Sequence, residues 1–442
     1  MMQTYAEYDS YQEYSINHSE LLLPDHWQVE KCRFAFNFSK GLTITKENLQ
    51  ETGIPCVNYG EIHSKFGFEV DPLKHDLKCV DPSYLKLGKG SLLAKGDFVF
   101  ADTSEDIEGS GNFTRLNSTE PTFAGYHTLI ARAKGDANTR FLAYVLDSAS
   151  FRKQVRKSVK GVKVFSITQA ILKNTSVWLP PLHDQTAIAG FLDEKIAKID
   201  ELVGIKRRQI ALLGERKQIL IQNAITKGLN PNAPLKDSGV DWIGKIPAHW
   251  EVKPAKHLFI EVDERSENGE EELLSVSHMT GVTPRSEKTV SMFLAEDYSG
   301  SKICKKDDLV FNIMWAWMGA LGVSPLVGIV SPSYAVFRQL KAQTFNPVYL
   351  EMLMQSLGYV EHYNKVSTGL HSSRLRFYSH MFLSMKIGYP SFDEQEQIIE
   401  FLNRETGKIT KAISVLENQI TKLNEYKTTL INAAVTGKIK VA

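Results

Sequence analysis

The chain has 442 residues, enough for two or three domains with separate hydrophobic cores. Its composition, 43% hydrophobic and 23% charged, is that of a globular protein and excludes a largely disordered chain. The formal net charge of +1 excludes a globally basic surface, so any attraction to nucleic acid or membrane must be local. The cysteines form no CxxC pair, a spacing that suits neither a zinc site nor a disulfide framework and fits a reducing cytoplasm. They are Cys32, Cys56, Cys79 and Cys304.

The first 22 residues are polar and acidic with no apolar core, so we expect a loosely held extension and not a signal peptide. A Pro-x-His-Trp pattern follows at Pro24–Trp27 and returns at Pro247–Trp250. Each copy opens a region rich in short predicted strands and Gly/Asp/Pro turns. We expect the two regions to be globular domains that span residues 23–178 and 246–388.

In the first region, the phrase "AKGDFVF" from Ala94 predicts a turn and a strand, and a glycine-rich segment follows it. Asn and Arg side chains can read adenine and guanine edges in the major groove of DNA. We therefore predict DNA contacts from Ser110, Asn112 and Arg115. His127, in "GYHTL", has no partner visible in the sequence and is expected to be an ordinary hydrogen-bonded histidine.

A basic run ends this region. The segment "RKQVRKSVKGVK", residues 152–163, carries six basic residues and no acid. A solvated helix face is one interpretation, because charge runs are usually exposed. Phosphate contact at a helix end and its following loop is the other, and it makes Arg156, Lys160 and Lys163 candidate DNA-binding residues.

Two long helices are predicted in residues 179–245 and 389–442, and they repeat one another without a gap. Gln185 aligns with Gln395, and the agreement continues to Thr226 and Thr436. Such a match indicates a tandem duplication. At 1.5 Å per residue, about 40 helical residues give a rod of roughly 60 Å.

Both helices carry apolar residues at steps of four and three, the heptad pattern of a coiled coil. We predict that the helices pair with each other through these positions. The predicted helix-pair interface consists of Ile199, Val203, Ile210, Leu213, Leu220, Ile409, Ile413, Leu416, Ile420, Leu423 and Leu430.

The second globular region has its own version of the strand phrase, "KKDDLVF" from Lys305. The uncharged stretch from Leu309 to Val330 has 22 residues, the length of a membrane span, but its glycines and proline favour two buried strands joined by a loop. Within it, Trp315 is a candidate apolar DNA contact. After Gly369, small hydroxyls and guanidinium groups suit a close approach to a phosphate backbone. These further candidates are Ser372, Ser373, Arg374 and Arg376.

No catalytic constellation emerges from the sequence. The Gly-x-Gly motifs in "LGKGSLL" and "EGSGNF" do not lead into an apolar helix, as a dinucleotide-binding loop requires. The acidic segment "EVDERSENGEEE" from Glu261 resembles a solvated loop more than a metal site. Asp193–Lys195 looks nuclease-like in isolation, but it lies on a heptad helix where charge pairs are routine. We therefore expect no catalytic residue and no metal in this chain.

Taken with the duplicated helices and the paired Pro-x-His-Trp motifs, the phrase "PPLHDQ…FLDEKIAKIDEL" gives the chain a clear resemblance, which covers Leu23 to Ala442. It resembles the specificity subunits of type I restriction–modification systems. The phrases "GDFVFADTSEDIEGSGNFTR" and "DDLVFNIMWAWMGALGVS" also look like the openings of two recognition-domain types of that family. The resemblance implies an α+β fold, a tandem duplication of two globular α/β target-recognition domains separated by two long helices that form an antiparallel coiled coil. The implied divisions are residues 1–22, 23–178, 179–245, 246–388 and 389–442.

The resemblance also implies a function. Each domain would read one half of a split, asymmetric site in double-stranded DNA. The helices would dock two methyltransferase subunits and, through them, the restriction subunits. The chain itself would be a non-catalytic, cytoplasmic subunit without a cofactor, while S-adenosylmethionine, ATP and magnesium would belong to its partners. Two alternatives are a methyltransferase or nuclease with fused recognition domains, and a coiled-coil adaptor that binds proteins only.

Overall fold

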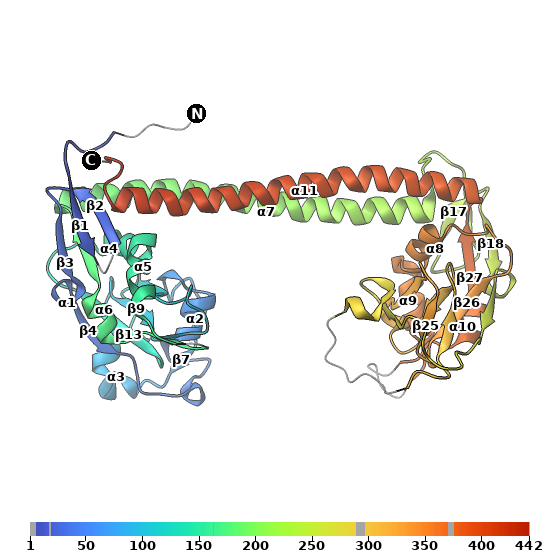
Figure 1. Ribbon diagram of the computed structural model, residues 1–442, viewed down its shortest axis with the longest axis horizontal. Coiled ribbons are helices and arrows are strands. Elements are labelled where there is room, and N and C mark those ends of the chain that lie inside the picture. Colours follow the sequence, from blue (N-terminus) through green and yellow to red (C-terminus); the bar gives the residue numbers. More distant parts are fainter. Residues whose placement is uncertain (1–5, 17–18, 162, 289–296, 370–374, 442) are drawn as a thin grey trace. The chain divides into compact units, whose positions relative to one another are not determined.

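The computed structural model describes residues 6–16, 19–161, 163–288, 297–369 and 375–441. The chain forms two compact units. Unit 1 comprises Met1–Lys206 and Glu417–Ala442, and unit 2 comprises Arg207–Leu416. Two long helices, α7 (Leu182–Lys227) and α11 (Phe392–Val435), each contribute one part to each unit (Figure 1).

Unit 1 contains a series of short strands and six short α-helices in its described residues. The strands are β1 (Tyr11–Ile16), β2 (Ser19–Pro24), β3 (Gln28–Lys31), β4 (Phe36–Lys40), β5 (Ile54–Val57), β6 (Phe68–Val70), β7 (Cys79–Val80), β8 (Leu92–Leu93), β9 (Phe98–Ala101), β10 (Thr103–Ser104), β11 (Phe113–Leu116), β12 (Thr122–Ala124), β13 (Thr128–Ala133), β14 (Phe165–Ser166) and β15 (Ser176–Leu179). The helices are α1 (Cys32–Ala35), α2 (Tyr59–Ser64), α3 (Tyr84–Leu87), α4 (Thr139–Asp147), α5 (Ala149–Ser158) and α6 (Gln169–Asn174), with 3-10 turns η1 (Lys46–Asn48) and η2 (Lys89–Ser91).

The core of unit 1 lies on both faces of a five-stranded sheet of order β4-β13-β9-β11-β6. Every residue of β9 is buried, because the strand lies at the centre of the sheet with its two aromatic side chains on one face and its two small aliphatic ones on the other. Phe98 and Phe100 pack into one apolar cluster with α4 and α7, whereas Val99 and Ala101 pack into another with α2. A second sheet, of order β7-β5-β12-β8, lies in the same unit.

Unit 2 is likewise built from short strands and short helices. Its strands are β16 (Leu235–Asp237), β17 (Lys245–Pro247), β18 (Glu251–Pro254), β19 (Phe259–Val262), β20 (Leu274–Ser277), β21 (Gly281–Pro284), β22 (Lys302–Cys304), β23 (Leu309–Phe311), β24 (Leu321–Val323), β25 (Gly328–Val330), β26 (Ala335–Gln339) and β27 (Lys386–Tyr389). Its helices are α8 (Pro347–Met354), α9 (Leu357–Val366) and α10 (Ser379–Ser384), with 3-10 turns η3 (Ala255–His257), η4 (Arg285–Glu287) and η5 (Ala316–Met318). The main sheet has the order β19-β26-β23-β24.

The strand phrase shared by the two regions forms the same local structure twice. Asp97 precedes β9 and accepts from the Ala94 N–H at 2.9 Å, and Arg132 on β13 reaches its carboxylate at 3.1 Å. In unit 2, Asp308 precedes β23 and pairs in the same way with Arg338 on β26 at 2.8 Å. The duplication therefore extends to the globular regions, whose sequences differ much more than those of the helices.

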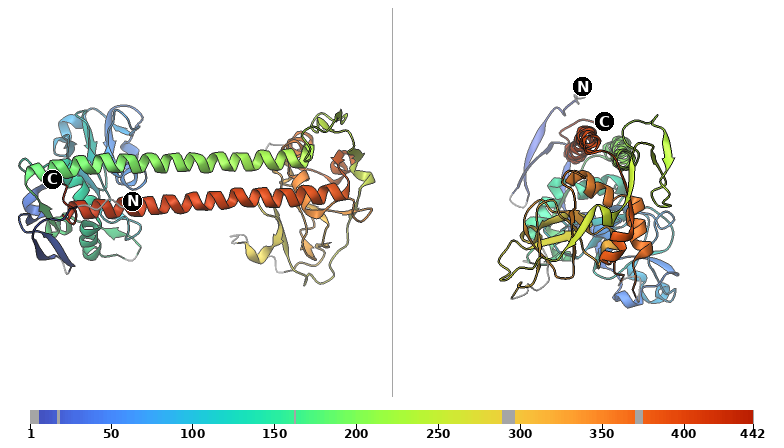
Figure 2. Two further views of the ribbon diagram at one scale, coloured as in Figure 1. Left: turned by 90° about the horizontal axis from the view of Figure 1, so that it is seen from above. Right: turned by 90° about the vertical axis from the view of Figure 1, so that its right-hand side faces the viewer.

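The two long helices run antiparallel where they meet in unit 1. The Lys427 ammonium lies 2.7 Å from Asp200, and the Lys206 ammonium donates to Gln419 at 2.6 Å. The residue number rises along α7 as it falls along α11, and Figure 2 shows the helices side by side here. Helices α4 and α5 pack against this pair, through Tyr144 to Asp193 and Ser150 to Asn432.

In unit 2 the same two helices pair antiparallel again, with Lys217 donating to Thr410 at 3.1 Å. The predicted heptad positions all lie on the less exposed side of the helices. Those that are buried are Ile199, Val203, Ile409 and Leu430. Those that are half-buried are Ile210, Leu213, Leu220, Ile413, Leu416, Ile420 and Leu423.

The Pro-x-His-Trp motif forms a turn that contacts the first turn of a long helix. In unit 1, His26 Nε2 lies 3.5 Å from Asp184 in the first turn of α7. In unit 2, His249 Nε2 lies 2.8 Å from Glu394 in the first turn of α11. The motif recurs because each half of the chain needs the same joint between a globular region and a helix.

A hairpin precedes each of these turns. The first is β1–β2, with Tyr11 opposite Pro24, and the second is β16–β17, with Leu235 opposite Pro247. The expected loose N-terminal extension is therefore a folded hairpin, and the expected boundary at residue 23 falls inside β2. The hairpin is held by the C-terminal segment, since the Tyr11 hydroxyl donates to Gly437 O at 2.8 Å. Figures 1 and 2 show the C-terminal segment beside these strands.

The uncharged stretch Leu309–Val330 forms three short strands, β23, β24 and β25, with the turn η5 between the first two. We expected two strands; Gly319 at φ 83° ends η5 and allows the chain to turn back into β24. In the described residues, no helix has both the length and the apolarity needed to cross a membrane.

Candidate nucleic-acid interface

The two loops predicted to contact DNA in unit 1 lie side by side. Strand β10, which starts the glycine-rich loop, pairs with β14, which ends the basic loop, and places Thr103 opposite Ser166. The Ile167 N–H also donates to Asp102 O at 2.7 Å. Arg156 on α5 spans the two loops, donating from Nη2 to the Glu108 carbonyl at 2.7 Å.

Asn112 is the centre of a hydrogen-bond chain on this surface. His63 Nε2 lies 2.8 Å from the Thr103 carbonyl, so it carries the proton, and Nδ1 accepts from Asn112 Nδ2 at 2.9 Å. Asn112 Oδ1 accepts from Arg152 Nη1 at 2.7 Å, and Arg152 Nη2 pairs with Asp147 at 2.8 Å. Asn112 and Arg152 are therefore held in fixed orientations at the surface.

Ser110 and Arg115, in contrast, lie in the interior of unit 1. Ser110 is fully buried and Arg115 is only 7% exposed. Arg115 is on β11 directly opposite Glu69 on β6, and its Nη1 lies 2.8 Å from that carboxylate. Burial lowers the pKa of Arg115, and the negative charge of Glu69 acts in the opposite direction. We therefore assign Arg115 a structural role and withdraw the prediction that it reads a base.

The same ion-pair network explains the nuclease-like sequence at residues 193–195. Asp193 accepts from Arg140 Nε at 2.7 Å and from the Tyr144 hydroxyl at 2.5 Å. Arg140 also contacts Glu69, the partner of Arg115. Asp193 thus links α7 to α4. Within the described residues, no group of three or more His, Cys, Asp or Glu is arranged to hold a metal ion.

The basic loop that follows α5 is open to solvent. Lys160 and Lys163 are both exposed, and Lys160 forms a β-bridge with Ser166 beside the start of the glycine-rich loop. Arg156 is half-buried and pairs with Glu108 at 2.7 Å. Exposed ammonium groups such as those of Lys160 and Lys163 can contact phosphates, whereas the Arg156 guanidinium is already paired with Glu108.

A cluster of aromatic and histidine side chains, which sequence reasoning did not single out, adjoins these loops. His127 Nδ1 lies 3.2 Å from Asp102, so the expected hydrogen-bonded histidine has its partner. Tyr59 and Tyr126 pack edge-on against the His127 ring, with ring centroids 5.3 and 5.9 Å away. Tyr59 lies also 6.4 Å from His63. The four rings come from two segments that are far apart in sequence, α2 and the turn at Tyr126 and His127, so only the pattern "GYH" hinted at them.

Unit 2 brings its two predicted loops together by an equivalent contact. The Phe377 N–H donates to Ile313 O at 3.0 Å, as Ile167 does to Asp102 in unit 1. Trp315, at the start of η5, is 47% exposed and stacks on Trp317, with ring centroids 5.9 Å apart. Trp317 itself is half-buried. An exposed indole thus occupies the loop that in unit 1 carries hydrogen-bonding side chains.

The candidates after Gly369 lie partly outside the described residues. Ser372, Ser373 and Arg374 belong to the segment that the structure does not describe. Arg376 is half-buried and exchanges two backbone hydrogen bonds with Thr368, at 2.8 and 3.1 Å. The backbone that carries Arg376 is therefore fixed beside the loop of Ile313.

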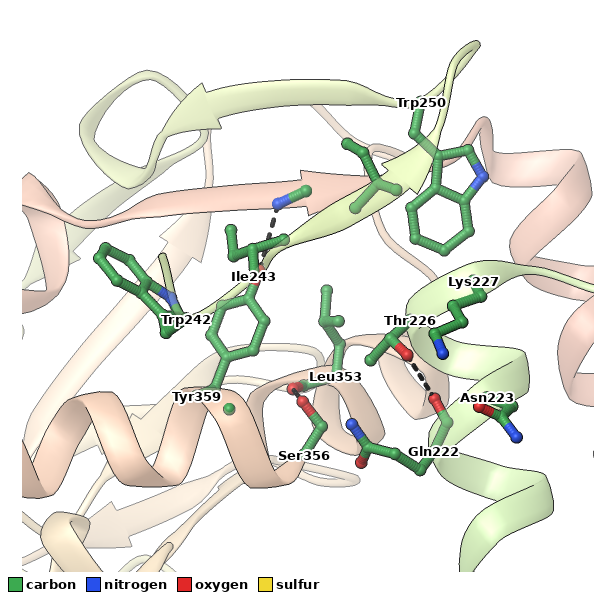
Figure 3. Close-up of a pocket in the computed structure, with 13 residues that line it drawn as sticks. Gln222, Asn223, Thr226, Lys227, Trp242, Ile243, Trp250, Leu353, Ser356 and Tyr359 are labelled. Carbon is green, nitrogen blue, oxygen red and sulfur yellow. Dashed lines mark hydrogen bonds between the residues drawn. The ribbon is translucent and has the colours of Figure 1, made fainter. Parts of the chain in front are cut away.

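A pocket of about 210 Å³ lies at the C-terminal end of α7, within unit 2 (Figure 3). The Thr226 hydroxyl donates to the Gln222 carbonyl, and the Ser356 hydroxyl to the Leu353 carbonyl. The side chains that line the pocket include no carboxylate, imidazole or thiol. The pocket therefore lies between the end of α7 and the neighbouring elements of unit 2, and the hydroxyls of Thr226 and Ser356 are both bonded to backbone carbonyls.

Comparisons with a family model and with a curated protein both find similarity to type I restriction specificity subunits. The family model for the type I restriction modification DNA specificity domain matches residues 24–210. A type I restriction enzyme specificity subunit of Methanocaldococcus jannaschii, MjaVIII, is 26% identical over 314 residues, which is 67% of this chain and 70% of the relative.

Two solved structures share the fold over nearly the whole chain. One comes from work on complex assembly and conformational transition of the type I R-M system, with a TM-score of 0.64 and 16% identity; the match covers 94% of this chain and 99% of that one. The other is the HsdS subunit from Thermoanaerobacter tengcongensis, with a TM-score of 0.51 and 15% identity over 94% and 98% of the chains. The two likenesses show that the α+β architecture, with its two globular units and long helices, is a known one.

Proposed function

The chain belongs to the family of type I restriction–modification specificity subunits, and we propose that it reads DNA for such a complex. Each unit would read one half of a split, asymmetric sequence in double-stranded DNA. The observation that carries this proposal is the pair of equivalent contacts, Ile167 to Asp102 and Phe377 to Ile313. They join the same two loops in both units.

The side chains on and beside these equivalent loops differ in chemistry. Unit 1 presents Asn112, Arg152 and His127, which offer hydrogen bonds, together with the exposed lysines of the basic loop. Unit 2 presents the exposed indole of Trp315. Hydrogen-bonding groups and apolar groups suit different base edges, so this difference supports two unlike half-sites.

We propose that the helix pair docks two methyltransferase subunits and that restriction subunits join through them. Both units leave apolar side chains exposed on the helices, outside the seam. In unit 1 they include Leu202, Ile205 and Tyr426, and in unit 2 they include Leu212, Ile219 and Val415. Exposed apolar residues on an otherwise charged helix pair support a protein partner there.

The chain would itself be non-catalytic and cytoplasmic. S-adenosylmethionine would bind to the methyltransferase subunits, and ATP and magnesium to the restriction subunits. A net charge of +1 fits this division, because partner subunits that share the phosphate contacts leave this chain with only a local basic loop.

The experiment that tests this function is genome-wide mapping of methylated bases in cells that express the chain with its methyltransferase partner. We expect a split, asymmetric motif that disappears when this gene is deleted. A motif that persists without the chain would contradict the proposal, and so would the absence of any motif when the complex is intact. The protein-only adaptor predicts the second of these results.

A further inference from the structure

His127 combines exposure with an unusual backbone conformation. Its φ of 54° lies in the left-handed region, which few residues other than glycine adopt, and its side chain is 57% exposed. Non-glycine residues in this region are strained, and such strain gathers at functional sites. The protein therefore has a histidine at a position where a glycine would make the folded state more stable.

The neighbours of His127 fix the orientation of its imidazole. Asp102 lies 3.2 Å from Nδ1, so that nitrogen donates its proton to the carboxylate and Nε2 of the neutral ring is an acceptor. Asp102 is itself held at both backbone groups, by His127 O at 3.0 Å and by the Ile167 N–H at 2.7 Å. Tyr59 and Tyr126 pack edge-on against the ring. The acceptor is therefore oriented before any ligand arrives.

The location of this acceptor matches a DNA interface. Asp102 leads into β10, whose partner strand β14 follows the exposed Lys160 and Lys163. Lysines that meet phosphates position a protein on the duplex, and acceptors beside them can read base edges. In the major groove, the groups that an acceptor can recognise are the exocyclic amino groups N6 of adenine and N4 of cytosine.

We propose that His127 is a base-reading residue of unit 1, whose Nε2 accepts a hydrogen bond from the exocyclic amino group of an adenine or a cytosine. The inference rests on the proposed function and adds two details to it: the protein atom, His127 Nε2, and the base group that it recognises, an exocyclic amino group. Asp102 acts as a positioning residue, because it sets the tautomer of His127 without touching the base.

The test replaces His127 in the full chain, expressed with its methyltransferase partner, and maps the methylated motif. The variant His127→Phe keeps a ring against Tyr59 and Tyr126 and removes both nitrogens, and His127→Ala is a second variant. The exposed His278 of unit 2 gives a matched control, His278→Phe. We expect both His127 variants to relax one position of one half-site, leaving its other positions and the second half-site unchanged.

A binding measurement then identifies the base. In the complex, removing one exocyclic amino group from the duplex should weaken binding about fivefold to tenfold at the position that His127 reads. Purine in place of adenine, or 2-pyrimidinone in place of cytosine, supplies this change and distinguishes the two bases. The complex with the His127→Phe variant should bind the duplexes with and without this amino group equally well.

An unchanged motif in both His127 variants would overturn the inference and leave the proposed function intact. Equal loss of methylation at every position would mark His127 as purely structural and would overturn it too. If the wild-type chain directs no motif, the proposed function fails, and the inference fails with it.

Discussion

The indole N–H of Trp250 donates to Glu394 at 3.1 Å, and the same carboxylate pairs with His249 at 2.8 Å. One side chain of α11 therefore satisfies both polar groups of the Pro-x-His-Trp turn in unit 2. In unit 1 the equivalent acid is Asp184, which is one methylene shorter and lies 3.5 Å from His26 and 2.9 Å from His183. The buried indole N–H of Trp27 has no hydrogen-bond partner among the described residues.

This asymmetry predicts that Asp184→Glu stabilises unit 1. The longer side chain can reach the Trp27 N–H as Glu394 reaches Trp250, and satisfying a buried donor is worth about 1 kcal/mol. Urea unfolding followed by far-ultraviolet circular dichroism measures the change. The reciprocal variant Glu394→Asp should cost about 1–3 kcal/mol, because it leaves the Trp250 N–H unpaired. If both variants lose stability equally, the unpaired indole is not the cause.

Two glycines at the ends of the long helices allow a paired test of the same joints. Gly228 and Gly437 both have positive φ, 73° and 68°. A Cβ on Gly437 would collide with the ring of Pro24, whereas one on Gly228 would lie 3.0 Å from Glu394 Oε1, the end of a flexible side chain. Strain alone should cost Gly228→Ala about 1 kcal/mol, and the added collision should raise the cost of Gly437→Ala to about 2–4 kcal/mol. Equal losses in urea unfolding would show that the Pro24 contact relaxes freely.

The features predicted well from sequence were those with a period or a repeat. The heptad positions, such as Ile199 and Ile409, face inward because a helical pattern fixes which side of the helix is apolar. The repeated Pro-x-His-Trp pattern pointed to the duplication, and it recurs because both turns contact the first turn of a long helix. The N-terminal hairpin was missed because its second strand ends at Pro24, inside the turn motif, and because the contact of Tyr11 with Gly437 joins residues 426 positions apart.

The residues of the interface were harder to assign, because burial depends on strand neighbours that are distant in sequence. Arg115 looked like a base reader in a glycine-rich segment, yet its partner Glu69 lies 46 positions away on a parallel strand. His127 looked ordinary because nothing in "GYHTL" indicates a left-handed backbone or the carboxylate of Asp102. Composition identifies groups that can contact DNA, and only tertiary structure selects those that reach the surface.

Arg115→Ala should therefore reduce stability without changing the sequence that is read. Removing the guanidinium leaves Glu69 with one cation fewer in a largely buried network, which we expect to cost about 2–4 kcal/mol in the free energy of unfolding. Urea unfolding measures this loss, and the methylated motif should stay the same in cells that still contain folded protein. A relaxed motif with unchanged stability would restore Arg115 as a base reader.

The basic loop of unit 1 should contribute affinity that does not depend on sequence. The logarithm of the binding constant falls as the logarithm of the salt concentration rises, and each lost phosphate contact makes this slope shallower by about 0.9. Lys160→Gln and Lys163→Gln together should therefore make it shallower by about 1.8. Binding of the complex to specific and unrelated duplexes, measured across salt concentrations, should weaken by the same factor for both. The exposed Lys422 on α11 provides a control, Lys422→Gln, which should leave the slope unchanged. A loss confined to the specific duplex would mean that these lysines read bases.

The helix pair should set the number of base pairs between the two half-sites. Seven residues add about 10 Å to a helix, which corresponds to about three base pairs at 3.4 Å each. Inserting one heptad after Lys206 and one after Leu416 keeps the apolar seam in phase on both helices, because seven residues restore the same face. The methylated motif should then keep both half-sites and gain about three unread base pairs between them. An insertion in α7 alone displaces its seam against α11, and we expect that variant to lose methylation. A double insertion that changes a half-site at constant spacing would contradict the role of the helices as a ruler.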